Sequence, residues 1–308
     1  MTIDDRLLVV VAGPTAVGKT SFAISLARLF CTEILSADSR QFYRDMHIGT
    51  AAPTETELAA VKHHFIQHLS VTDSYDMSKF EQDALALLDR LFEVHPVVVL
   101  VGGSGLYINA VCHGIDQLPD PDPEIRRELK NTLEQDGIAA LQQELSGLDP
   151  VYAGQVDMEN PVRLMRAIEI CRATGVAYSA LRTNKPKERN FRILKLGLEL
   201  PREILYQRID DRVDLMMESG LFDEALSLYN SRGMNALNTV GYKELFDHFE
   251  GLTSLEHAVE KIKTHSRRYA KRQLTWFRKD PGYAWFKPDE IEKVVEFIRQ
   301  NMKKQENQ

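Results

Sequence analysis

The sequence has few cysteines and no long hydrophobic run, and both absences exclude classes of protein. Its three cysteines, Cys31, Cys112 and Cys171, stand alone without a C-x-x-C pair, which argues against a disulfide scaffold and against a cysteine zinc site. Apolar runs such as Leu7–Ala12 and Val97–Val101 are of strand length, whereas a membrane-spanning helix needs about 18 residues. The opening stretch MTIDDRLL carries two acids and no basic region, so we expect no signal peptide. These features predict a cytoplasmic protein without membrane contact.

Acidic residues are missing from one stretch of an otherwise acidic protein. The chain has 38 Lys and Arg against 45 Asp and Glu, a net charge of −7, which argues against indiscriminate nucleic-acid binding because such binding depends on phosphate neutralisation. Residues 261–279 nevertheless contain eight Lys or Arg and no acid. Six of the cations recur at near-helical spacing in two adjacent rows, Arg267, Lys271 and Arg278, and then Arg268, Arg272 and Lys279. The stretch predicts either a local docking face or a solvated helix face.

Apolar strands alternate with helices along the first third of the chain. The predicted strands are 7–12, 33–37 and 97–101, and the predicted helices are 19–30 and 77–93. Such alternation is typical of an α/β fold in which crossover helices connect the strands of a parallel sheet.

The pattern changes after residue 117, where closely spaced prolines punctuate LPDPDPE. Asp122 followed by Pro123 predicts a helix N-cap with proline at the first helical position. Helical periodicity continues to about residue 190, and the strand-like stretch 191–200 follows. We therefore predict a core domain formed by residues 1–117 and 191–308 and a helical insertion domain formed by residues 118–190.

A phosphate-binding loop follows the first strand. The stretch GPTAVGKT matches the full G-x4-G-K-T pattern between a strand and a helix, and it consists of Gly13, Pro14, Thr15, Ala16, Val17, Gly18, Lys19 and Thr20. Its glycines let backbone N–H groups turn toward an anion, and the helix N-terminus adds partial positive charge. Lys19 supplies a full charge, and the hydroxyl of Thr20 can ligate Mg²⁺. The alternative is a chance glycine turn before a helix.

The parts that usually accompany nucleotide hydrolysis are missing. The loop alone suggests ATP or GTP, but the strand in PVVVLVGG ends in glycines rather than in an acid that holds Mg²⁺, and the guanine-binding N-K-x-D pattern is not completed. Asp38 falls just past the second strand, at the ligand edge of open α/β sheets. It is either a ligand-orienting or proton-accepting carboxylate or a turn cap. Ser104, in a glycine turn, either contacts a ligand or shapes the turn.

Several motifs, in this order, resemble those of the tRNA dimethylallyltransferase (isopentenyltransferase) family. They are GPTAVGKT (13–20), DSRQFYRDMHIGTAAPT (38–54), VGGSGLYI (101–108), ENPVRLMRAIEI (159–170), TVGYKEL (239–245) and RRYAKRQLTWFR (267–278). The first is shared by many nucleotide-binding proteins, and the others are much more specific. The resemblance extends from about residue 7 to residue 286, and it implies a P-loop NTPase-like parallel-sheet core with a helical insertion.

The resemblance implies prenyl transfer, which explains why the hydrolysis parts are missing. A dimethylallyl group would pass from dimethylallyl diphosphate to N6 of the adenosine just 3′ of the anticodon in tRNA. The loop would hold the diphosphate together with Mg²⁺ at Thr20, and Lys19, Thr15 and Arg212 would act on the departing diphosphate. Asp38 matches the general base of the family, which takes a proton from the weakly nucleophilic exocyclic amine.

The same resemblance implies a set of tRNA contacts. They are Asp38, Ser39, Arg40, Gln41, Ser104, Arg126, Glu159, Asn160, Pro161, Val162 and Arg163, and the basic stretch adds Lys271, Arg272 and Arg278. Two positions depart from the family pattern. Ser104 stands where many relatives have threonine and keeps the hydroxyl, whereas Val162 stands where some have glutamine and loses a side-chain hydrogen bond. The partners expected are the tRNA anticodon loop and dimethylallyl diphosphate, and the protein is expected to be a monomer.

Two other classes of protein stay open at this point. A small-molecule kinase would use ATP at the same loop and need no RNA, and a non-catalytic RNA-binding module would not need Lys19. His63 and His64 are interpreted as ordinary loop or strand histidines rather than as a metal pair. Four residues of the basic stretch are interpreted as core anchors rather than stacking platforms, Tyr269, Leu274, Trp276 and Phe277.

Overall fold

The computed structural model describes residues 6–120, 122–183 and 185–303, and the chain divides into two compact units. The first unit comprises Met1–Cys112 and Arg189–Gln308, and the second comprises His113–Glu188. The opening stretch MTIDDRLL lies mostly outside the described residues. Both crossings between the units fall within a few residues of the predicted domain bounds, 117/118 and 190/191.

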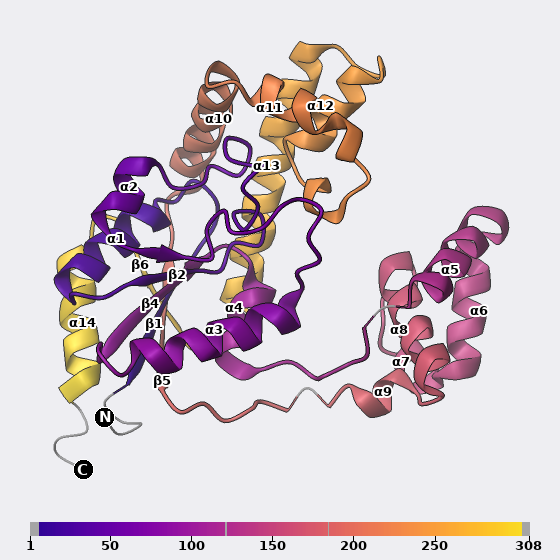
Figure 1. The fold of residues 1–308 in the computed structure, drawn as a ribbon, viewed down its shortest axis with the longest axis horizontal. Coiled ribbons are helices and arrows are strands. Elements are labelled where there is room, and N and C mark those ends of the chain that lie inside the picture. Colours follow the sequence, from indigo (N-terminus) through magenta and orange to yellow (C-terminus); the bar gives the residue numbers. More distant parts are fainter. Residues whose placement is uncertain (1–5, 121, 184, 304–308) are drawn as a thin grey trace. The chain divides into compact units, whose positions relative to one another are not determined.

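A parallel sheet forms the centre of the first unit (Figure 1). Within the described residues it has six strands in the order β3-β2-β4-β1-β5-β6, and every pairing is parallel. The strands are β1 (Leu7–Ala12), β2 (Ile34–Ser36), β3 (His63–His64), β4 (Val97–Gly102), β5 (Arg192–Leu198) and β6 (Tyr283–Phe286). The predicted α/β class with a parallel sheet is therefore confirmed.

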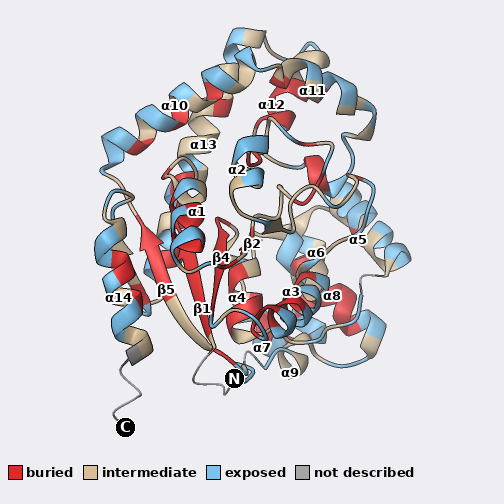
Figure 2. Cartoon of the chain, turned by 60° about the vertical axis from the view of Figure 1, so that its left-hand side comes forward, coloured by how far each residue is buried: buried red, intermediate tan, exposed pale blue. Residues whose placement is uncertain are grey.

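Side-chain alternation along the central strands supplies two hydrophobic cores, one on each face of the sheet. Leu8 and Val10 of β1 pack into one core, and Leu7, Val9 and Val11 pack into the other. All of β1 is buried, which is why its sequence is a continuous apolar run rather than a polar and apolar alternation. Figure 2 shows the buried strands flanked by helices that are buried on their inner sides and exposed on their outer sides.

The helices of the first unit cover both faces of this sheet. One core receives side chains from α1, α10 and α14, and the other from α3, α4, α11 and α12. The helices are α1 (Lys19–Leu29), α2 (Glu55–Ala60), α3 (Met77–Leu91), α4 (Gly105–His113), α10 (Arg202–Glu218), α11 (Leu221–Leu228), α12 (Tyr242–Phe249), α13 (Leu255–Arg278) and α14 (Ile291–Lys303). Two short 3₁₀ turns, η2 (Tyr229–Ser231) and η3 (Asn235–Leu237), lie between α11 and α12.

The second unit is helical and has a core of its own. Its helices are α5 (Pro123–Asp136), α6 (Ile138–Leu148), α7 (Pro150–Ala153), α8 (Pro161–Thr174) and α9 (Tyr178–Leu181). Leu129, Leu141 and Leu164 are fully buried in this core. The predicted N-cap is confirmed, because Asp122 accepts the backbone N–H of Glu124 at 2.8 Å ahead of a helix whose first residue is proline.

The predicted strands and helices shift by at most two residues at either end, but two short edge strands were not assigned from the sequence. His63 and His64 form β3 at one edge, where Nε2 of His64 lies 2.5 Å from the Glu33 carboxylate. At the other edge, β6 pairs with β5. Each is too short for its pattern to be distinguished from a loop. Of the helices in the described residues, none has both the length and the apolar character that crossing a membrane requires.

Candidate active site

The phosphate loop opens onto a large cavity at the carboxyl edge of the sheet. Because all strands run parallel, the segments that follow β1, β2 and β4 meet at this edge. The cavity has a volume of about 1060 Å³ and lies within the first unit. Its walls come from the loop and α1, the segments 36–41 and 49–51, helix α10 and helix α13.

Five of the eight loop residues line this cavity, namely Thr15, Ala16, Gly18, Lys19 and Thr20. Val17 is instead fully buried in the core beneath the loop. Gly18 is the N-cap of α1 with a φ of 102°, a left-handed conformation that glycine adopts without strain. It brings the positive N-terminus of α1 to the cavity, which is the arrangement that binds phosphate groups.

Lys19 carries its ammonium group at the floor of the cavity. Its Nζ donates a hydrogen bond to the carbonyl oxygen of Pro14 at 2.7 Å. Burial lowers the pKa of Lys19 from 10.5 to about 8, while the negative charge of Asp38 opposes that shift and the nearby Arg212 adds to it. The charge of Lys19 is therefore poorly compensated in the ligand-free protein, and an anion bound to the loop would stabilise it.

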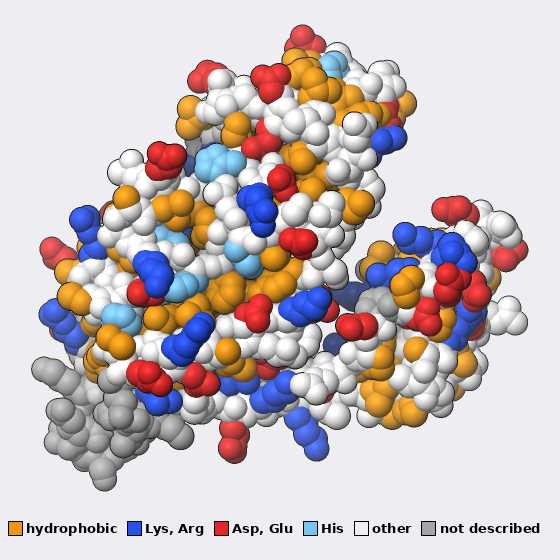
Figure 3. All heavy atoms as spheres, in the orientation of Figure 1, with side chains coloured by type: hydrophobic (Ala, Val, Ile, Leu, Met, Phe, Trp, Pro, Cys, Tyr) orange, Lys and Arg blue, Asp and Glu red, His pale blue; other side chains and the backbone are white. Residues whose placement is uncertain are grey.

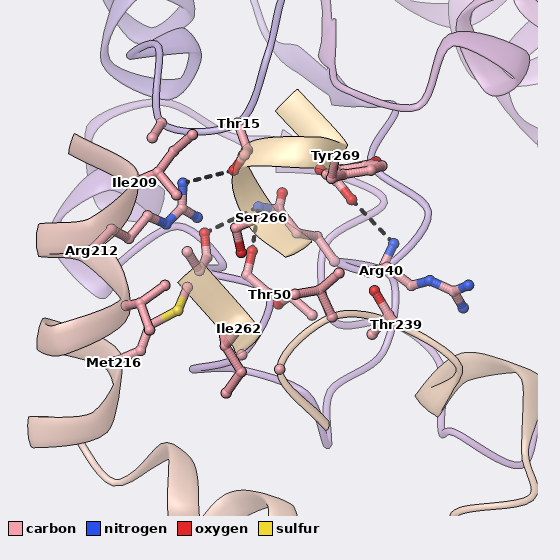
Figure 4. Close-up of a pocket in the computed structure, with 18 of the residues that line it drawn as sticks. Thr15, Arg40, Thr50, Ile209, Arg212, Met216, Thr239, Ile262, Ser266 and Tyr269 are labelled. Atoms are coloured by element: carbon pink, nitrogen blue, oxygen red, sulfur yellow. Dashed lines mark hydrogen bonds between the residues drawn. The ribbon is translucent and has the colours of Figure 1, made fainter. Parts of the chain in front are cut away.

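Arg212 of α10 brings a second cation to the loop. Its Nη1 donates to the hydroxyl oxygen of Thr15 at 3.3 Å, across 197 residues of sequence (Figure 4). Burial lowers the pKa of this guanidinium, which still remains charged at neutral pH. Since Thr15 accepts from Arg212, its own hydroxyl proton points elsewhere and can be donated to a ligand oxygen.

Asp38 lies in the segment after β2 and lines the same cavity as Lys19 and Arg212. One carboxylate oxygen, Oδ1, accepts the backbone N–H of Arg40 at 3.2 Å, whereas Oδ2 has no hydrogen bond to any of the described residues. The turn-cap interpretation is therefore confirmed, and because Asp38 also lines the cavity, its role as a ligand-orienting or proton-accepting carboxylate stays a prediction. Its charge acts on Lys19 and Arg212, and together with burial it raises the pKa of Tyr269.

The three residues after Asp38 are hydrogen-bonded to other segments of the first unit. Ser39 donates its backbone N–H to Oγ of Ser104 at 3.1 Å. The guanidinium of Arg40 donates to the carbonyl oxygens of Asn235 and Ala236 at 2.8 and 3.0 Å. The side-chain amide of Gln41 donates to the carbonyl oxygens of Thr50 and Ala51. All three side chains lie at or beside the cavity, and their contact with tRNA stays a prediction.

Helix α13 divides the basic residues of the stretch 261–279 between two sides. Lys261, Arg268 and Arg272 line the main cavity. Lys271 and Arg278 line a separate cavity of about 550 Å³, and Arg278 pairs there with Glu199 at 2.7 Å. The stretch is therefore not one continuous docking face. On the face of the molecule in Figure 3, cationic and anionic side chains are likewise interspersed.

Two more cations of this stretch are paired within the first unit. Both oxygens of Asp210 accept Nη1 of Arg267 at 2.6 Å, and Lys263 pairs with Asp214 at 2.7 Å. Of the four predicted core anchors, Phe277 is buried and Leu274 is partly buried against the core. Tyr269 lines the main cavity, and the prediction is wrong for Trp276, which is 41% exposed.

The remaining predicted tRNA contacts belong to the second unit. Asn160 caps α8 through the backbone N–H of Arg163, and Pro161 begins that helix. Val162 is 65% exposed. Nε of Arg126 lies 3.5 Å from Oε1 of the buried Glu169, whose other oxygen accepts from Arg166 at 3.0 Å. Glu159 accepts from Gln142 at 3.3 Å.

The described residues contain no group of three or more His, Cys, Asp or Glu side chains placed to hold a metal ion. Mg²⁺ does not require such a cage, because it keeps several waters and binds through one or two protein ligands and substrate phosphates. The hydroxyl of Thr20 lines the cavity and makes no hydrogen bond to another described residue. The donor set thus fits a metal that arrives with a diphosphate.

Several residues that line or support the site were not singled out from the sequence, and Arg208, Glu224 and Gln273 are examples. Arg208 lies one helical turn before Arg212 and lines the same wall of the cavity. Glu224 accepts the backbone N–H groups of residues 47–49, and Gln273 bonds to the phosphate loop. A polar residue at a core position of an amphipathic helix was the available signal for Gln273, since Ala270 and Phe277 on the same side are buried.

The fold and the cavity define a P-loop NTPase-like protein in which a phosphate loop faces a carboxylate. Residues 41–280 match the family described as IPP transferase. The chain is 55% identical to a tRNA dimethylallyltransferase of Christiangramia forsetii, over 94% of this chain and 95% of that one. It is 50% identical to tRNA dimethylallyltransferase 2 of Parabacteroides distasonis, over 96% and 99%. The chain belongs to this family of tRNA dimethylallyltransferases.

Solved structures agree with this assignment. The full-length tRNA isopentenylpyrophosphate transferase of Bacillus halodurans is 37% identical, with a TM-score of 0.72 and coverage of 98% of both chains. A eukaryotic dimethylallyltransferase that acts on tRNA has a TM-score of 0.72 at 28% identity, over 88% of this chain and 69% of that one.

Proposed function

We propose that this member of the tRNA dimethylallyltransferase family transfers the dimethylallyl group of dimethylallyl diphosphate to N6 of the adenosine just 3′ of the tRNA anticodon. The bond between the allylic carbon and the diphosphate oxygen breaks, a carbon–nitrogen bond forms, and diphosphate leaves. The observation that carries the proposal is that one cavity is lined both by the phosphate loop and by the carboxylate of Asp38.

Binding of the diphosphate is assigned to the loop side of the cavity. The N-terminus of α1, Lys19 and Arg212 together oppose the negative charge that builds up on the leaving group. The hydroxyl of Thr15, oriented by Arg212, donates to the departing oxygen. Because the reacting carbon is allylic and tolerates positive charge, stabilising the leaving group is the main electrostatic requirement.

Proton transfer is assigned to Asp38 in the same cavity. The exocyclic amine of adenine is a poor nucleophile, and the uncommitted oxygen Oδ2 of Asp38 accepts its proton as the new bond forms. To reach a carboxylate inside this cavity, the adenosine has to leave the base stack of the anticodon loop. Arg268 and Arg272 line the cavity and are placed to meet RNA phosphates.

Mg²⁺ is expected to bind with the diphosphate at the hydroxyl of Thr20. When bound, it neutralises part of the charge on the phosphate oxygens. Further tRNA contacts are assigned to the second unit through Arg126 and Arg163, which place cations on α5 and α8.

The test is label transfer from radiolabelled dimethylallyl diphosphate to unmodified tRNA whose anticodon ends in adenosine, in the presence of Mg²⁺. We expect Asp38→Asn to lower turnover by about 10²- to 10⁴-fold while tRNA binding is nearly retained, because the substitution removes the proton acceptor and its charge but keeps a side-chain oxygen for the backbone N–H of Arg40. Asp289→Asn removes an exposed carboxylate outside the cavity and should transfer label at the wild-type rate.

A parallel reaction with labelled ATP and no RNA separates the alternatives. ATP consumption without label on tRNA would contradict prenyl transfer and favour a small-molecule kinase that binds ATP at the loop. Unchanged function in Lys19→Ala would instead favour a non-catalytic RNA-binding module.

A further inference from the structure

Gln273 makes a two-sided hydrogen-bonded bridge inside the first unit. Its side chain is only 6% exposed. Oε1 accepts the backbone N–H of Thr15 at 2.8 Å, and Nε2 donates to the carbonyl oxygen of Gly103 at 2.9 Å. The orientation of the amide follows from its partners, since a backbone N–H only donates and a carbonyl only accepts. The bridge joins the phosphate loop to the turn after β4.

The turn after β4 in turn holds Asp38 from both sides. Ser104 donates its backbone N–H to the carbonyl oxygen of Ala37 at 3.3 Å, and its hydroxyl oxygen accepts the backbone N–H of Ser39 at 3.1 Å. The residues immediately before and after Asp38 are thereby fixed to the residue that follows Gly103. A continuous set of short contacts therefore runs from Thr15 through Gln273 to Asp38.

The fit around the bridge is close. A Cβ added at Gly103 would lie 2.3 Å from Nε2 of Gln273, and the next nearest side-chain atom outside that amide is Nζ of Lys19 at 3.7 Å. A methyl group at residue 103 would therefore have to displace the amide, which is the movable end of a flexible side chain. Glycine at residue 103 therefore leaves room for the amide of Gln273, whereas any side chain there would collide with it.

We propose that Gln273 is a positioning residue that sets the separation between Thr15, at the leaving group, and Asp38, at the proton acceptor. The inference rests on the proposed transfer reaction. Bond formation and bond breaking occur at one carbon atom, so both groups must be held at once, and misplacement by about 1 Å can cost about 10²-fold in rate. A carboxamide suits the task because it donates and accepts simultaneously without carrying charge next to Lys19.

Gln273→Glu and Gln273→Met test the proposal in the label-transfer assay. At pH 8 we expect both to lower kcat by about 10- to 100-fold, with KM for each substrate changed by less than about threefold, because both hydrogen bonds of the Gln273 side chain go to backbone groups of the protein. Gln135→Glu makes the same chemical change at an exposed position of the second unit and should leave kcat unchanged.

The pH dependence separates a bridge from a general packing role. A protonated carboxyl group accepts through one oxygen and donates through the other, so it can remake both hydrogen bonds, whereas a carboxylate cannot donate to Gly103. Burial raises the pKa of a carboxyl group at this position, while the positive charge of the nearby Lys19 opposes that rise. The kcat of Gln273→Glu relative to wild type should therefore rise as the pH falls from 8 to 6, and that of Gln273→Met should stay flat.

Gly103→Ala is the second route to the same displacement, and thermal melting reports whether each variant is folded. The kcat of Gly103→Ala should fall as in Gln273→Met. Combining Gly103→Ala with Gln273→Met should lower kcat little further, because both substitutions break the same bridge. Wild-type kcat in all folded variants, or a rise in KM for tRNA at constant kcat, would overturn the inference. Loss of transfer by the wild-type protein would instead overturn the proposed function, and this inference with it.

Discussion

Lys19 shows at the scale of one residue how the site is prepared for an anion. Its ammonium group is buried, close to the guanidinium of Arg212, and bonded to one backbone carbonyl. Each of the first two features disfavours the charged form, and only Asp38 favours it at longer range. A diphosphate bound at the loop would add negative charge beside Lys19 and so favour its charged form.

The lowered pKa of Lys19 predicts an alkaline limit on diphosphate capture. Above pH 8 the free protein progressively loses the charge on this side chain, so kcat/KM for dimethylallyl diphosphate should fall as pH rises through about 8. Initial rates at subsaturating diphosphate between pH 6.5 and 9.5 measure this. Lys19→Arg, whose side chain stays charged, should lack the alkaline fall whatever its absolute rate. A profile that is flat to pH 9.5 in the wild-type protein would contradict the assignment.

Helix α11 shows at the scale of an element how a distant helix shapes the cavity wall. Its Glu224 accepts the backbone N–H groups of His47, Ile48 and Gly49 at 2.7–2.9 Å and the hydroxyl of Tyr242 at 2.6 Å. The loop before residues 49–51, which line the cavity, is thereby fixed without a regular element of its own.

Removal of this acceptor should destabilise the first unit. Glu224→Ala leaves three backbone donors and one hydroxyl without their partner, which should lower the free energy of unfolding by about 1–3 kcal/mol. Asp223→Ala, its exposed neighbour in the first turn of α11, should cost less than about 0.5 kcal/mol. Urea denaturation of both variants gives the comparison, and equal losses would show that the loop does not depend on Glu224.

The whole molecule consists of two units whose hydrophobic cores are separate. The cores of the first unit lie on the two faces of its sheet, and the second unit has its own core around Leu129, Leu141 and Leu164. A change in one core should therefore act mainly on its own unit.

Leu164→Ala tests this separation. The substitution removes a fully buried side chain from α8 and should destabilise the second unit by about 2–5 kcal/mol. Hydrogen exchange followed by mass spectrometry should show faster exchange across α5, α6 and α8 and unchanged protection in β1 and β4. Val294→Ala in α14 is the matched change in the first unit and should give the opposite pattern. Faster exchange in both units for either variant would show that they unfold together.

Local sequence determined much of the architecture and the position of the phosphate loop and Asp38 in it. The apolar run of β1, the loop GPTAVGKT and the pair Asp122-Pro123 act through neighbours in the chain. Periodicity and turn chemistry were therefore enough to predict the strand, the start of α1 after the loop and the start of α5. The parallel direction of the strands also follows from the alternation of strands and helices, and it places Asp38 and the phosphate loop at one edge of the sheet.

Only the tertiary structure decided which other residues belong to the site. Gln273 contacts its two partners across 258 and 170 residues of sequence. Glu224 contacts residues 47–49 across 175 to 177 residues. The cations of α13 belong to one stretch of sequence, but they are divided between two cavities because a helix turns successive residues to different sides. Contacts of this kind depend on how finished elements pack, so the sequence can mark Gln273 as a polar residue at a core position but cannot show which backbone groups it contacts.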